Sequence, residues 1–444
     1  MIIRRSLPYL ADSSRYFARI RPLGYPVLLD SCQPAAPMGR YDILSAAPVE
    51  LIRYRQGQDS GCPFDRLQQL LDRYAVECQP QPELPFCGGL IGHFGYDLGR
   101  SIEHLPQLAV NDMAYPDMQV GLYLWALIVD HQTERCELVM QPTMADADQQ
   151  RVLDALEGNE PDDGSGFQLT APFRANVSAD QYRQRLQRID DYIHAGDCYQ
   201  VNFAQRFTAG FSGDPWQAYL KLRQQAPTPF AAYLESPEGA VLSLSPERFL
   251  ELDGQNVVTK PIKGTRPRAA DPAEDQALAD ELLGSSKDRA ENLMIVDLLR
   301  NDLSKACRFG SVKVPKLFAL ESYANVHHLV STVTGELDKD SSALALLRSC
   351  FPGGSITGAP KLRAMEIIEE LEPHRRNIYC GSIGYVSFCG RMDTSICIRT
   401  LLAEQGKIHC WAGGGIVADS EIDLEYQETF NKVNNLLKTL EATL

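Results

Sequence analysis

Long apolar runs and paired cysteines are both missing from this sequence. No stretch of about twenty consecutive apolar residues occurs, so no segment is predicted to span a membrane. The start, MIIRRSLPYLADSSRYF, also lacks the apolar segment of a secretory signal. The 12 cysteines are scattered singly from Cys32 to Cys410, which is typical of reduced thiols rather than of a disulfide framework or a zinc site. We therefore expect a cytoplasmic protein.

Basic residues are scarce as well. The chain has 43 Lys and Arg against 58 Asp and Glu, a formal net charge of -15, and no basic stripe is visible. A nucleic acid partner is therefore not expected, and an anionic substrate would need local cations or directed N–H donors. Neither a GxGxxG context nor a GxxxxGK[ST] motif occurs, which leaves nucleotide-phosphate binding without support.

Turn-forming residues divide the chain near its first third. The acidic stretch EGNEPDDGSG (157–166) predicts a linker or exposed excursion over 151–170, between an N-terminal domain (1–150) and a longer catalytic domain (171–444). Before it, the segments 120–130 and 134–142 predict a β-hairpin. After it, Ser178 and Gln181 form a capping-box pattern at the start of a predicted helix.

Strands and helices then alternate without βαβ regularity, which indicates an α+β architecture. The segment 287–303 is apolar around most of its circumference and predicts a buried helix, and a last helix is expected from Ile422 to Leu440. Alternating segments predict strands over 198–207 and 231–262, and successive antiparallel strands over 379–389, 394–403 and 407–417.

Three glutamates could converge on a hard cation. Glu291 lies on the predicted buried helix, where an unpaired carboxylate is costly. Glu425 and Glu428 are three residues apart and so share one face of the last helix. These two could form a solvated acidic face instead. If the three carboxylates meet, they make an oxygen site of the kind that suits magnesium.

Other polar groups stand at unusual places. Arg399 lies inside an apolar strand, where its guanidinium is expected to pair with a buried carboxylate or with a substrate carboxylate. The loops 351–360 and 412–420 are rich in glycine and can direct backbone N–H groups at an anion, or can simply serve the fold. His327 and His328 are expected to be polar core residues, because their spacing does not select metal binding.

The stretch VVTKPIKGTRPR (257–268) places Lys263 after a strand, between Pro261 and a glycine. Glu247 lies on the preceding strand segment, at about the same height on the predicted hairpin, although the sequence leaves the register open. Such a lysine can be a nucleophile, and a glutamic acid of raised pKa can protonate a leaving hydroxyl. A solvated lysine is the alternative.

Five long motifs, taken together, resemble the chorismate-utilising enzymes. They are, in order, PIKGTRPR, KDRAENLMIVDLLRNDL, VHHLVSTVTG, FPGGSITGAPKLRAMEIIEELEP and AGGGIVADSEIDLEYQET. The N-terminal half resembles the first domain of that family at LLDS (28–31) and GGLIGHFGYDLGR (88–100). The resemblance implies an anthranilate-synthase-like fold, with two packed antiparallel β-sheets flanked by helices, and chorismate as the substrate.

Two positions sort the members of this family. Water-using members place a lysine base where this chain has Gln200, and ammonia users carry glutamine there. The second position is Lys263. There, anthranilate synthase component I carries a sequence similar to PIAGT, whereas this chain reads PIKGT. The resemblance thus implies that Lys263 attacks ring carbon 2 of chorismate while Glu247 protonates the leaving carbon 4 hydroxyl. Ammonia then adds at carbon 4 to give 4-amino-4-deoxychorismate, on the route to para-aminobenzoate and folate. Anthranilate synthase component I and a non-catalytic subunit that docks a glutaminase are the rival interpretations.

The resemblance also assigns the remaining positions. It implies Mg2+ held by Glu291 and Glu428 with support from Glu425, an active-site histidine at His328, and substrate contacts from Tyr379, Arg399, Gly413, Gly414, Gly415, Thr357 and Lys361. Leu29, Asp30 and Ser31 resemble the tryptophan pocket of the family. The reactive cysteine of the family's glutaminase, on a Gly-x-Cys-x-Gly turn, does not occur here. A separate glutamine amidotransferase subunit is therefore the expected partner.

Overall fold

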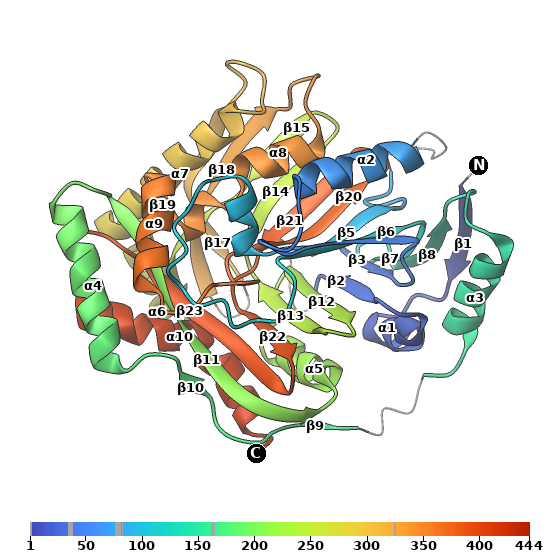
Figure 1. Cartoon of the computed structure of the whole chain (residues 1–444), viewed down its shortest axis with the longest axis horizontal. Coiled ribbons are helices and arrows are strands. Elements are labelled where there is room, and N and C mark those ends of the chain that lie inside the picture. The colour runs from blue at the N-terminus through green and yellow to red at the C-terminus, as the bar shows by residue number, and fades with distance from the viewer. Residues whose placement is uncertain (1, 34–38, 76–80, 82, 161–164, 324–325) are drawn as a thin grey trace.

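Two large antiparallel β-sheets, with helices on their outer faces, make up the body of the protein (Figure 1). The computed structural model describes residues 2–33, 39–75, 81, 83–160, 165–323 and 326–444. Both sheets contribute buried residues to one hydrophobic core, for example Leu127 and Leu242 from one sheet and Leu90 and Ile383 from the other. The predicted α+β fold with two packed antiparallel sheets is confirmed.

The strands are β1 (Ile3–Leu7), β2 (Val27–Asp30), β3 (Tyr41–Ser45), β4 (Glu50–Tyr54), β5 (Gly89–Phe94), β6 (Met118–Tyr123), β7 (Trp125–Asp130), β8 (Arg135–Met140), β9 (Phe167–Leu169), β10 (Arg174–Ala175), β11 (Gln200–Gly213), β12 (Phe230–Ser236), β13 (Gly239–Ser245), β14 (Arg248–Asp253), β15 (Asn256–Thr259), β16 (Ile262–Pro267), β17 (Lys313–Ser322), β18 (Val326–Glu336), β19 (Gly358–Ala359), β20 (Ser382–Ser387), β21 (Met392–Ile396), β22 (Thr400–Glu404) and β23 (Lys407–Ile416).

The helices are α1 (Ser14–Ile20), α2 (Pro63–Ala75), α3 (Asp146–Glu157), α4 (Ala179–His194), α5 (Pro215–Gln225), α6 (Pro272–Gly284), α7 (Ser286–Ser304), α8 (Ala343–Cys350), α9 (Lys361–Leu371) and α10 (Ile422–Glu441). Short 3-10 turns cover Arg21–Leu23, Tyr96–Ser101 and Gly354–Ile356.

In each sheet, strands of the N-terminal part form one end and strands of the C-terminal part form the other, and they meet at the β2–β12 and β5–β20 pairs. The larger sheet has the order β1-β8-β7-β3-β2-β12-β13-β22-β23-β11-β10, with β9 and β19 also on β11. The smaller sheet has the order β16-β18-β15-β14-β21-β20-β5-β6-β4, with β17 on β18. The predicted N-terminal and catalytic domains therefore share both sheets. Their boundary stays a prediction about the chain, and residues 161–164 of the predicted linker lie outside the described residues.

Local sequence signals were good guides to single elements. The β7–β8 hairpin forms as predicted, but the predicted strand 120–130 divides into β6 in the smaller sheet and β7 in the larger one. Helix α10 covers the expected last helix. The Ser178 hydroxyl accepts the backbone N–H of Gln181, and the Gln181 side chain accepts the backbone N–H of Ser178, so the capping box is confirmed.

Two local predictions need correction. The last strands are not successive neighbours, because β21 belongs to the smaller sheet whereas β22 and β23 pair in the larger one. The chain changes sheets between Ile396 and Thr400. Helix α7 is also less buried than predicted: it buries one face, which includes Ile295 and Leu299, while Leu293 on the other side is 47% exposed.

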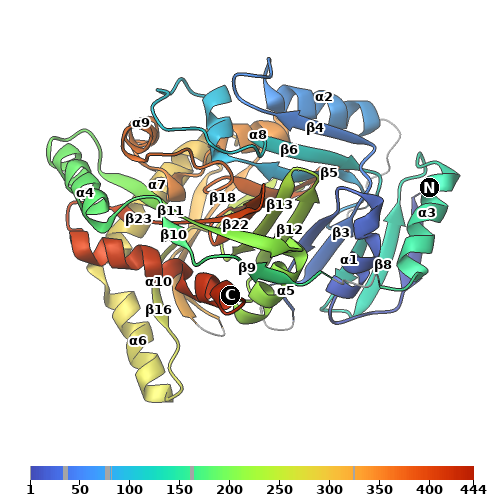
Figure 2. The same cartoon turned by 60° about the horizontal axis from the view of Figure 1, so that its bottom comes forward.

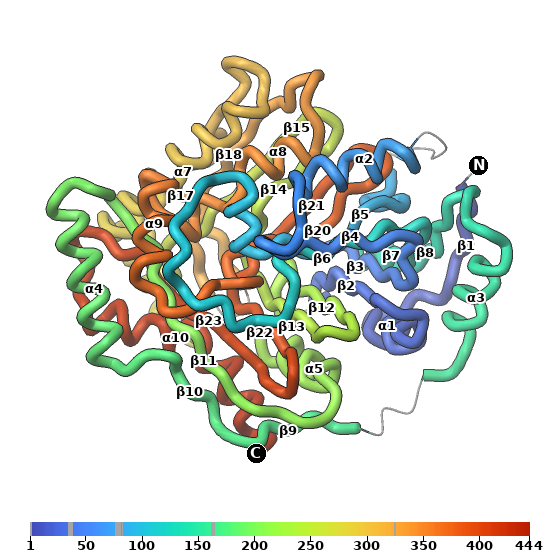
Figure 3. The backbone as a smooth tube through the Cα atoms, viewed as in Figure 1, coloured from blue at the N-terminus to red at the C-terminus, as the bar shows by residue number. Residues whose placement is uncertain are grey.

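Helices α10 and α7 close the site region from the outside. Helix α10 packs on β23, and α7 packs on β16 and β18. Helix α6 projects from the body beside β16 (Figure 2). The segment between β5 and β6 loops across toward α9, where Val110 bridges to His374 (Figure 3).

Within the described ranges, no helix is both long and apolar enough to cross a bilayer. The cysteines of these ranges form no disulfide.

Candidate active site

The glycine run of β23 forms the floor of the site, opposite β11. A Cβ atom on Gly415 would lie 2.1 Å from Gln200 Nε2 and 3.6 Å from Lys263 Nζ. Only a residue without a side chain leaves room for both groups. The structure therefore brings Gln200, Lys263 and Gly415 together.

Gly414, the next residue along β23, faces acidic groups. A Cβ atom there would lie 3.0 Å from Glu425 Oε2, 3.7 Å from Glu428 Oε1 and 3.7 Å from Lys432 Nζ. Gly413 serves the sheet instead, because its own Cβ would lie 2.3 Å from the Phe203 carbonyl oxygen. The missing side chain of Gly415 thus leaves space for Lys263 and Gln200. That of Gly414 leaves space for Glu425 and Glu428.

Lys263 and Glu247 meet through Ser355. Lys263 Nζ donates to the Ser355 carbonyl at 3.2 Å, and the Ser355 hydroxyl donates to Glu247 Oε1 at 2.7 Å. The predicted hairpin forms, because β14 and β15 pair antiparallel across the Asp253–Gly254 turn, with Glu251 opposite Val258. Lys263 itself lies on the following strand, β16, which pairs with β18. The loop before β19 then contacts both Lys263 and Glu247.

Glu247 has the electrostatics of a proton donor. Its side chain is deeply buried, and this burial raises its pKa to about 7 although the Ser355 hydroxyl and the Lys263 charge act in the opposite direction. A carboxyl group with this pKa is protonated in about half of the molecules at neutral pH, and the protonated form can give its proton to a leaving group.

Carboxylates of α7 and α10 lie close enough to Lys263 for its charge to lower their pKa values. Burial raises the pKa of Glu291, and the Glu425 charge adds to the rise, while Lys263 and Lys287 oppose it. Glu425 accepts from Lys287 Nζ at 3.2 Å and from the Ser420 hydroxyl at 2.7 Å. Glu425 is buried, so the alternative that it belongs to a solvated acidic face of the last helix is excluded.

Glu428 is held by a lysine of its own helix. Lys432 Nζ lies 2.5 Å from Glu428 Oε1 and donates to the Gly413 carbonyl at 2.9 Å. Burial raises the pKa of Glu428, but the Lys432 ion pair outweighs it and the net effect is a lowered pKa. In the described part of the chain, no three acidic, histidine or cysteine side chains are close enough to form a metal-binding group.

The positive charge of Arg399 is not balanced by a carboxylate of the described residues. It lies where the chain passes from one sheet to the other, with a left-handed backbone φ of 50°. Among the described residues no carboxylate is paired with its guanidinium, so the buried protein partner that the sequence allowed is not found there. Burial lowers the pKa of Arg399. A guanidinium without a protein partner suits a substrate carboxylate.

His328 is a neutral imidazole next to this cation. Burial and the Arg399 charge together lower its pKa to about 4. Its Nδ1 lies 2.9 Å from the Thr265 hydroxyl, and its ring makes an edge contact with Tyr323. The neutral ring can exchange hydrogen bonds in the site but carries no charge at neutral pH.

Three other residues that were predicted to contact the substrate interact with other residues of the protein. Tyr379 is buried, and its ring lies parallel to Trp411, with the ring centroids 6.2 Å apart. The Thr357 hydroxyl donates to the Gly353 carbonyl at 3.0 Å. Lys361 Nζ donates to Asp302 Oδ2 at 2.6 Å and to the Cys350 carbonyl at 3.0 Å, which ties α9 to α7 and α8. Their roles toward a substrate stay predictions.

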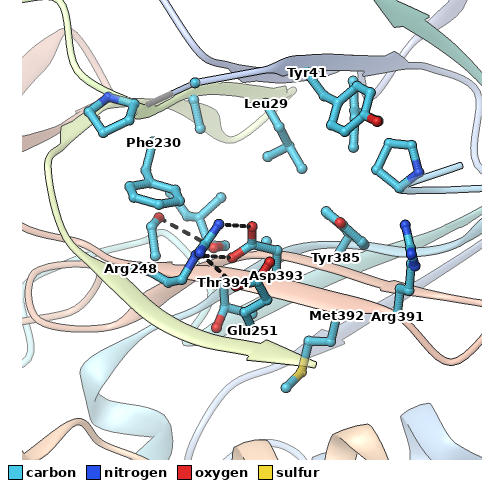
Figure 4. A pocket seen from close by; sticks show the side chains of 18 of the residues that line it. Leu29, Tyr41, Phe230, Arg248, Glu251, Tyr385, Arg391, Met392, Asp393 and Thr394 are labelled. Atoms are coloured by element: carbon cyan, nitrogen blue, oxygen red, sulfur yellow. Dashed lines mark hydrogen bonds and ion pairs between the residues drawn. The ribbon is translucent and has the colours of Figure 1, made fainter. Parts of the chain in front are cut away.

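A second cavity lies away from this cluster, between the two sheets (Figure 4). It has a volume of about 310 Å³, and Leu29 and Asp30 of the predicted tryptophan pocket line it. Arg248 forms ion pairs with Glu251 at 2.6 Å and Asp393 at 3.0 Å on its wall. Ser31, the third predicted residue, instead donates its hydroxyl to Asp42 at 2.6 Å.

Sequence reasoning missed three residues of the cluster. They are Ser355, Lys287 and Lys432. Lys432 follows Glu428 by four residues on a predicted helix, and this spacing is a signal for an ion pair. Ser355 and Lys287 lie inside two of the recognised motifs, but their spacing to Glu247 or Glu425 gives no sign of contact.

Taken together, the cluster can perform acid–nucleophile chemistry on a small carboxylated substrate. The model of the chorismate binding enzyme family matches residues 25–438, and the chain therefore belongs to this family. The resemblance expected from the five motifs is confirmed.

Within the family, the chain is similar to component 1 of aminodeoxychorismate synthase. The Escherichia coli protein of that name is 51% identical over 437 residues, which cover 96% of this chain and 95% of that one. Anthranilate synthase component 1 of Thermus thermophilus is 41% identical over 385 residues, or 85% and 83% of the two chains. The crystal structure of anthranilate synthase component I from Streptococcus pneumoniae has a TM-score of 0.79 and 32% identity, covering 90% of this chain and 92% of that one.

Proposed function

We propose that this protein is the chorismate-aminating component of an aminodeoxychorismate synthase, which converts chorismate and ammonia to 4-amino-4-deoxychorismate. The observation that carries the proposal is Lys263, which lies in the site and is linked through Ser355 to Glu247. Similarity to aminodeoxychorismate synthase component 1 over nearly the full length supports the same assignment.

The proposed reaction runs through a covalent lysine intermediate. Lys263 attacks ring carbon 2, the ring double bonds shift, and the hydroxyl on carbon 4 leaves as water with the proton of Glu247. Ammonia then adds at carbon 4, the double bonds shift back, and the bond to Lys263 breaks. Gln200 cannot take a proton from water, which favours ammonia as the second nucleophile. The enolpyruvyl group stays on the ring.

Arg399 and the floor of β23 hold the substrate in this scheme. Arg399 binds the enolpyruvyl carboxylate together with Tyr379, since its guanidinium has no partner in the described chain. The backbone of Gly413, Gly414 and Gly415 lies against the ring. His328, as a neutral imidazole, offers a hydrogen bond and no charge, while Thr357 and Lys361 shape the surrounding loop.

We propose Mg2+ as the cofactor. Glu291 and Glu428 would hold the ion with support from Glu425, and carboxylate oxygens are the donors that magnesium prefers. These side chains would have to draw together around the ion, because in the described part of the chain no three of them already form a metal-binding group. The pKa of Glu291, raised by burial and by Glu425, supports the fit, because a cation relieves this repulsion. When bound, magnesium supplies a positive charge for the ring carboxylate of chorismate.

The relatives' designation as component 1 supports a second subunit. We propose that a glutamine amidotransferase partner releases the ammonia, because the chain lacks the Gly-x-Cys-x-Gly turn of the family's glutaminase. Free ammonium salt should replace this partner. The cytoplasmic location expected from the sequence stays a prediction.

We also propose that the second cavity is the tryptophan pocket. Its volume of about 310 Å³ accommodates an amino acid, Leu29 and Phe230 offer apolar surface, and Asp30 and Glu251 offer carboxylates for an ammonium group. Calorimetric titration with tryptophan tests this proposal, and Leu29→Arg should abolish the binding while leaving ammonium-dependent turnover intact.

A product assay tests the main proposal. The purified chain is mixed with chorismate, magnesium and an ammonium salt, and the products are separated by chromatography. We expect 4-amino-4-deoxychorismate. Anthranilate as the sole product would instead favour the anthranilate synthase interpretation, and absence of turnover even with a glutaminase would favour the docking subunit.

The lysine intermediate has its own test by intact-protein mass spectrometry. A chorismate-derived adduct is expected on the unmodified chain and should be absent from Lys263→Ala. Lys260→Ala is the matched control, because Lys260 lies three residues earlier but pairs with Glu321 at 2.6 Å. An adduct that persists in Lys263→Ala would assign the nucleophile elsewhere.

A further inference from the structure

Two cysteines face each other at the end of the β5–β20 pair. The register pairs Ser387 with Gly89, and the Phe388 N–H donates to the Gly88 carbonyl at 2.9 Å just beyond it. Beyond this pair the two strands end, so that Cys87 lies two residues before β5 and Cys389 lies in the turn that follows β20. Both cysteines therefore lie beside Ser387 at this end of the sheet.

The two thiols already touch a common group. Cys87 Sγ lies 3.4 Å from the Ser387 hydroxyl, and Cys389 Sγ lies 3.3 Å from the same oxygen. The thiols also share a hydrogen bond with each other. Cys87 is 1% exposed, whereas Cys389 is only half-buried. A reagent from solvent can therefore reach Cys389 first.

The local environment divides the pair into an attacking and a resolving thiol. The hydrogen bond from Cys87 lowers the pKa of Cys389, and the Ser387 hydroxyl and the Arg391 charge act in the same direction against burial. The same thiol–thiol hydrogen bond, together with burial, raises the pKa of Cys87. The thiolate is the nucleophilic form of cysteine, so Cys389 is the attacking residue.

We propose that Cys87 and Cys389 are a redox modification site that forms a reversible disulfide with a low-molecular-weight disulfide as the oxidant. The Cys389 thiolate attacks one sulfur of the oxidant, forms a mixed disulfide and releases one thiolate. Cys87 then attacks Cys389 Sγ, expels the second thiolate and transfers its proton to it. Two protein thiols are oxidised by two electrons, and one oxidant molecule is reduced to two thiols.

The site borders the second cavity. Pro85, two residues before Cys87, and Arg391, two residues after Cys389, both line that cavity, and Figure 4 shows Arg391 at its edge. The disulfide would fasten these two wall segments to each other. The modification therefore acts on the cavity wall and leaves the Lys263 cluster unchanged.

Peptide mapping after oxidation tests the proposal. The full chain is treated with oxidised glutathione, the remaining thiols are alkylated, and peptides are analysed without reduction. We expect a linked peptide pair containing Cys87 and Cys389, two hydrogens lighter than the sum of the reduced peptides and released by dithiothreitol. Absence of this pair in the unmodified chain would overturn the proposal.

Variants test the order of the two steps. Cys87→Ser should hold glutathione on Cys389 as a stable mixed disulfide, because the resolving thiol is gone. Cys389→Ser should leave Cys87 unmodified, because that thiol is buried. Cys62→Ser is the matched control: Cys62 is also half-buried, and its loss should leave the linked pair unchanged. Glutathione on Cys87 in the Cys389→Ser variant would contradict the assigned order.

Discussion

Glu247 and Lys263 belong to segments that pair with different strands, yet they contact the same residue: Ser355 donates its hydroxyl to the acid at 2.7 Å and accepts from the amine through its carbonyl at 3.2 Å. The serine fixes the distance between the proton donor and the nucleophile. It also stabilises the ionised form of Glu247 and so limits how far burial raises the pKa of that group.

Ser355→Ala should shift the pH dependence of the reaction upward. Glu247 acts while protonated, so activity is expected to fall as the pH rises through its pKa of about 7. Loss of the Ser355 hydrogen bond destabilises the carboxylate and raises this pKa further. The falling limb of kcat against pH should therefore move up by about one pH unit. A downward shift would contradict the assignment of Glu247 as the acid.

Glu247→Gln removes the proton altogether. The amide is close in shape but cannot donate a proton to a leaving hydroxyl, so kcat should fall roughly 100- to 10,000-fold. Steady-state kinetics with ammonium salt measures this loss, and circular dichroism checks that the fold is kept. A variant with nearly full activity and an unchanged pH profile would remove Glu247 from the mechanism.

Arg399→Gln should weaken substrate binding more than turnover. A charge-assisted hydrogen bond contributes about 1.5–3 kcal/mol, which corresponds to a rise in KM for chorismate of roughly 10- to 100-fold. Stability should change little, because in the described part of the chain no carboxylate loses its partner. Arg248→Gln is the contrasting variant. It breaks the ion pairs with Glu251 and Asp393 and should lower the unfolding temperature without raising KM.

Adjacent glycines should respond differently to the same methyl group. Gly413→Ala puts a Cβ 2.3 Å from a backbone oxygen, which forces β23 away from β11 and should reduce the free energy of unfolding by about 3 kcal/mol. Gly414→Ala meets a carboxylate side chain at 3.0 Å, which can move. That variant should stay folded but need more magnesium for half-maximal activity. Calorimetry and a magnesium titration separate the two effects.

Lys361→Met should act on stability. Its ammonium pairs with Asp302, whose side chain is fully buried, so the variant leaves a poorly compensated charge and should cost about 3 kcal/mol in urea unfolding. Lys305 also contacts Asp302 but is half-exposed, and Lys305→Met should cost less than about 1 kcal/mol. Lys361→Met with normal stability and no activity would restore this residue to the substrate site.

Local elements could be predicted from the sequence because their signals are short-range. The Ser178–Gln181 capping box and the β7–β8 hairpin each depend on residues a few positions apart. Sheet order could not be predicted, because neighbours such as β5 and β20 are almost three hundred residues apart and no periodicity encodes the pairing. The change of sheet at Arg399 escaped prediction for the same reason.

The residues that make up the site stay a prediction, and the contacts among them could not be predicted from the sequence. Motif resemblance identified Lys263, Glu247 and Glu425 without any knowledge of the fold. It could not show that Lys287 neutralises Glu425 or that Ser355 connects acid and amine, since those contacts depend on which loops the two sheets bring together. Lys361 shows the opposite failure, because its motif position gave no hint of the ion pair with Asp302.

The pairing of an early strand with a late strand in each sheet has a consequence for synthesis of the protein. Strand β5 remains without its neighbour β20, and β2 without β12, until much later parts of the chain have left the ribosome. A nascent chain thus carries unsatisfied strand edges and bare apolar faces for most of its translation. Shielding by chaperones during that interval, more than the stability of the finished protein, should determine how much of it accumulates in a cell.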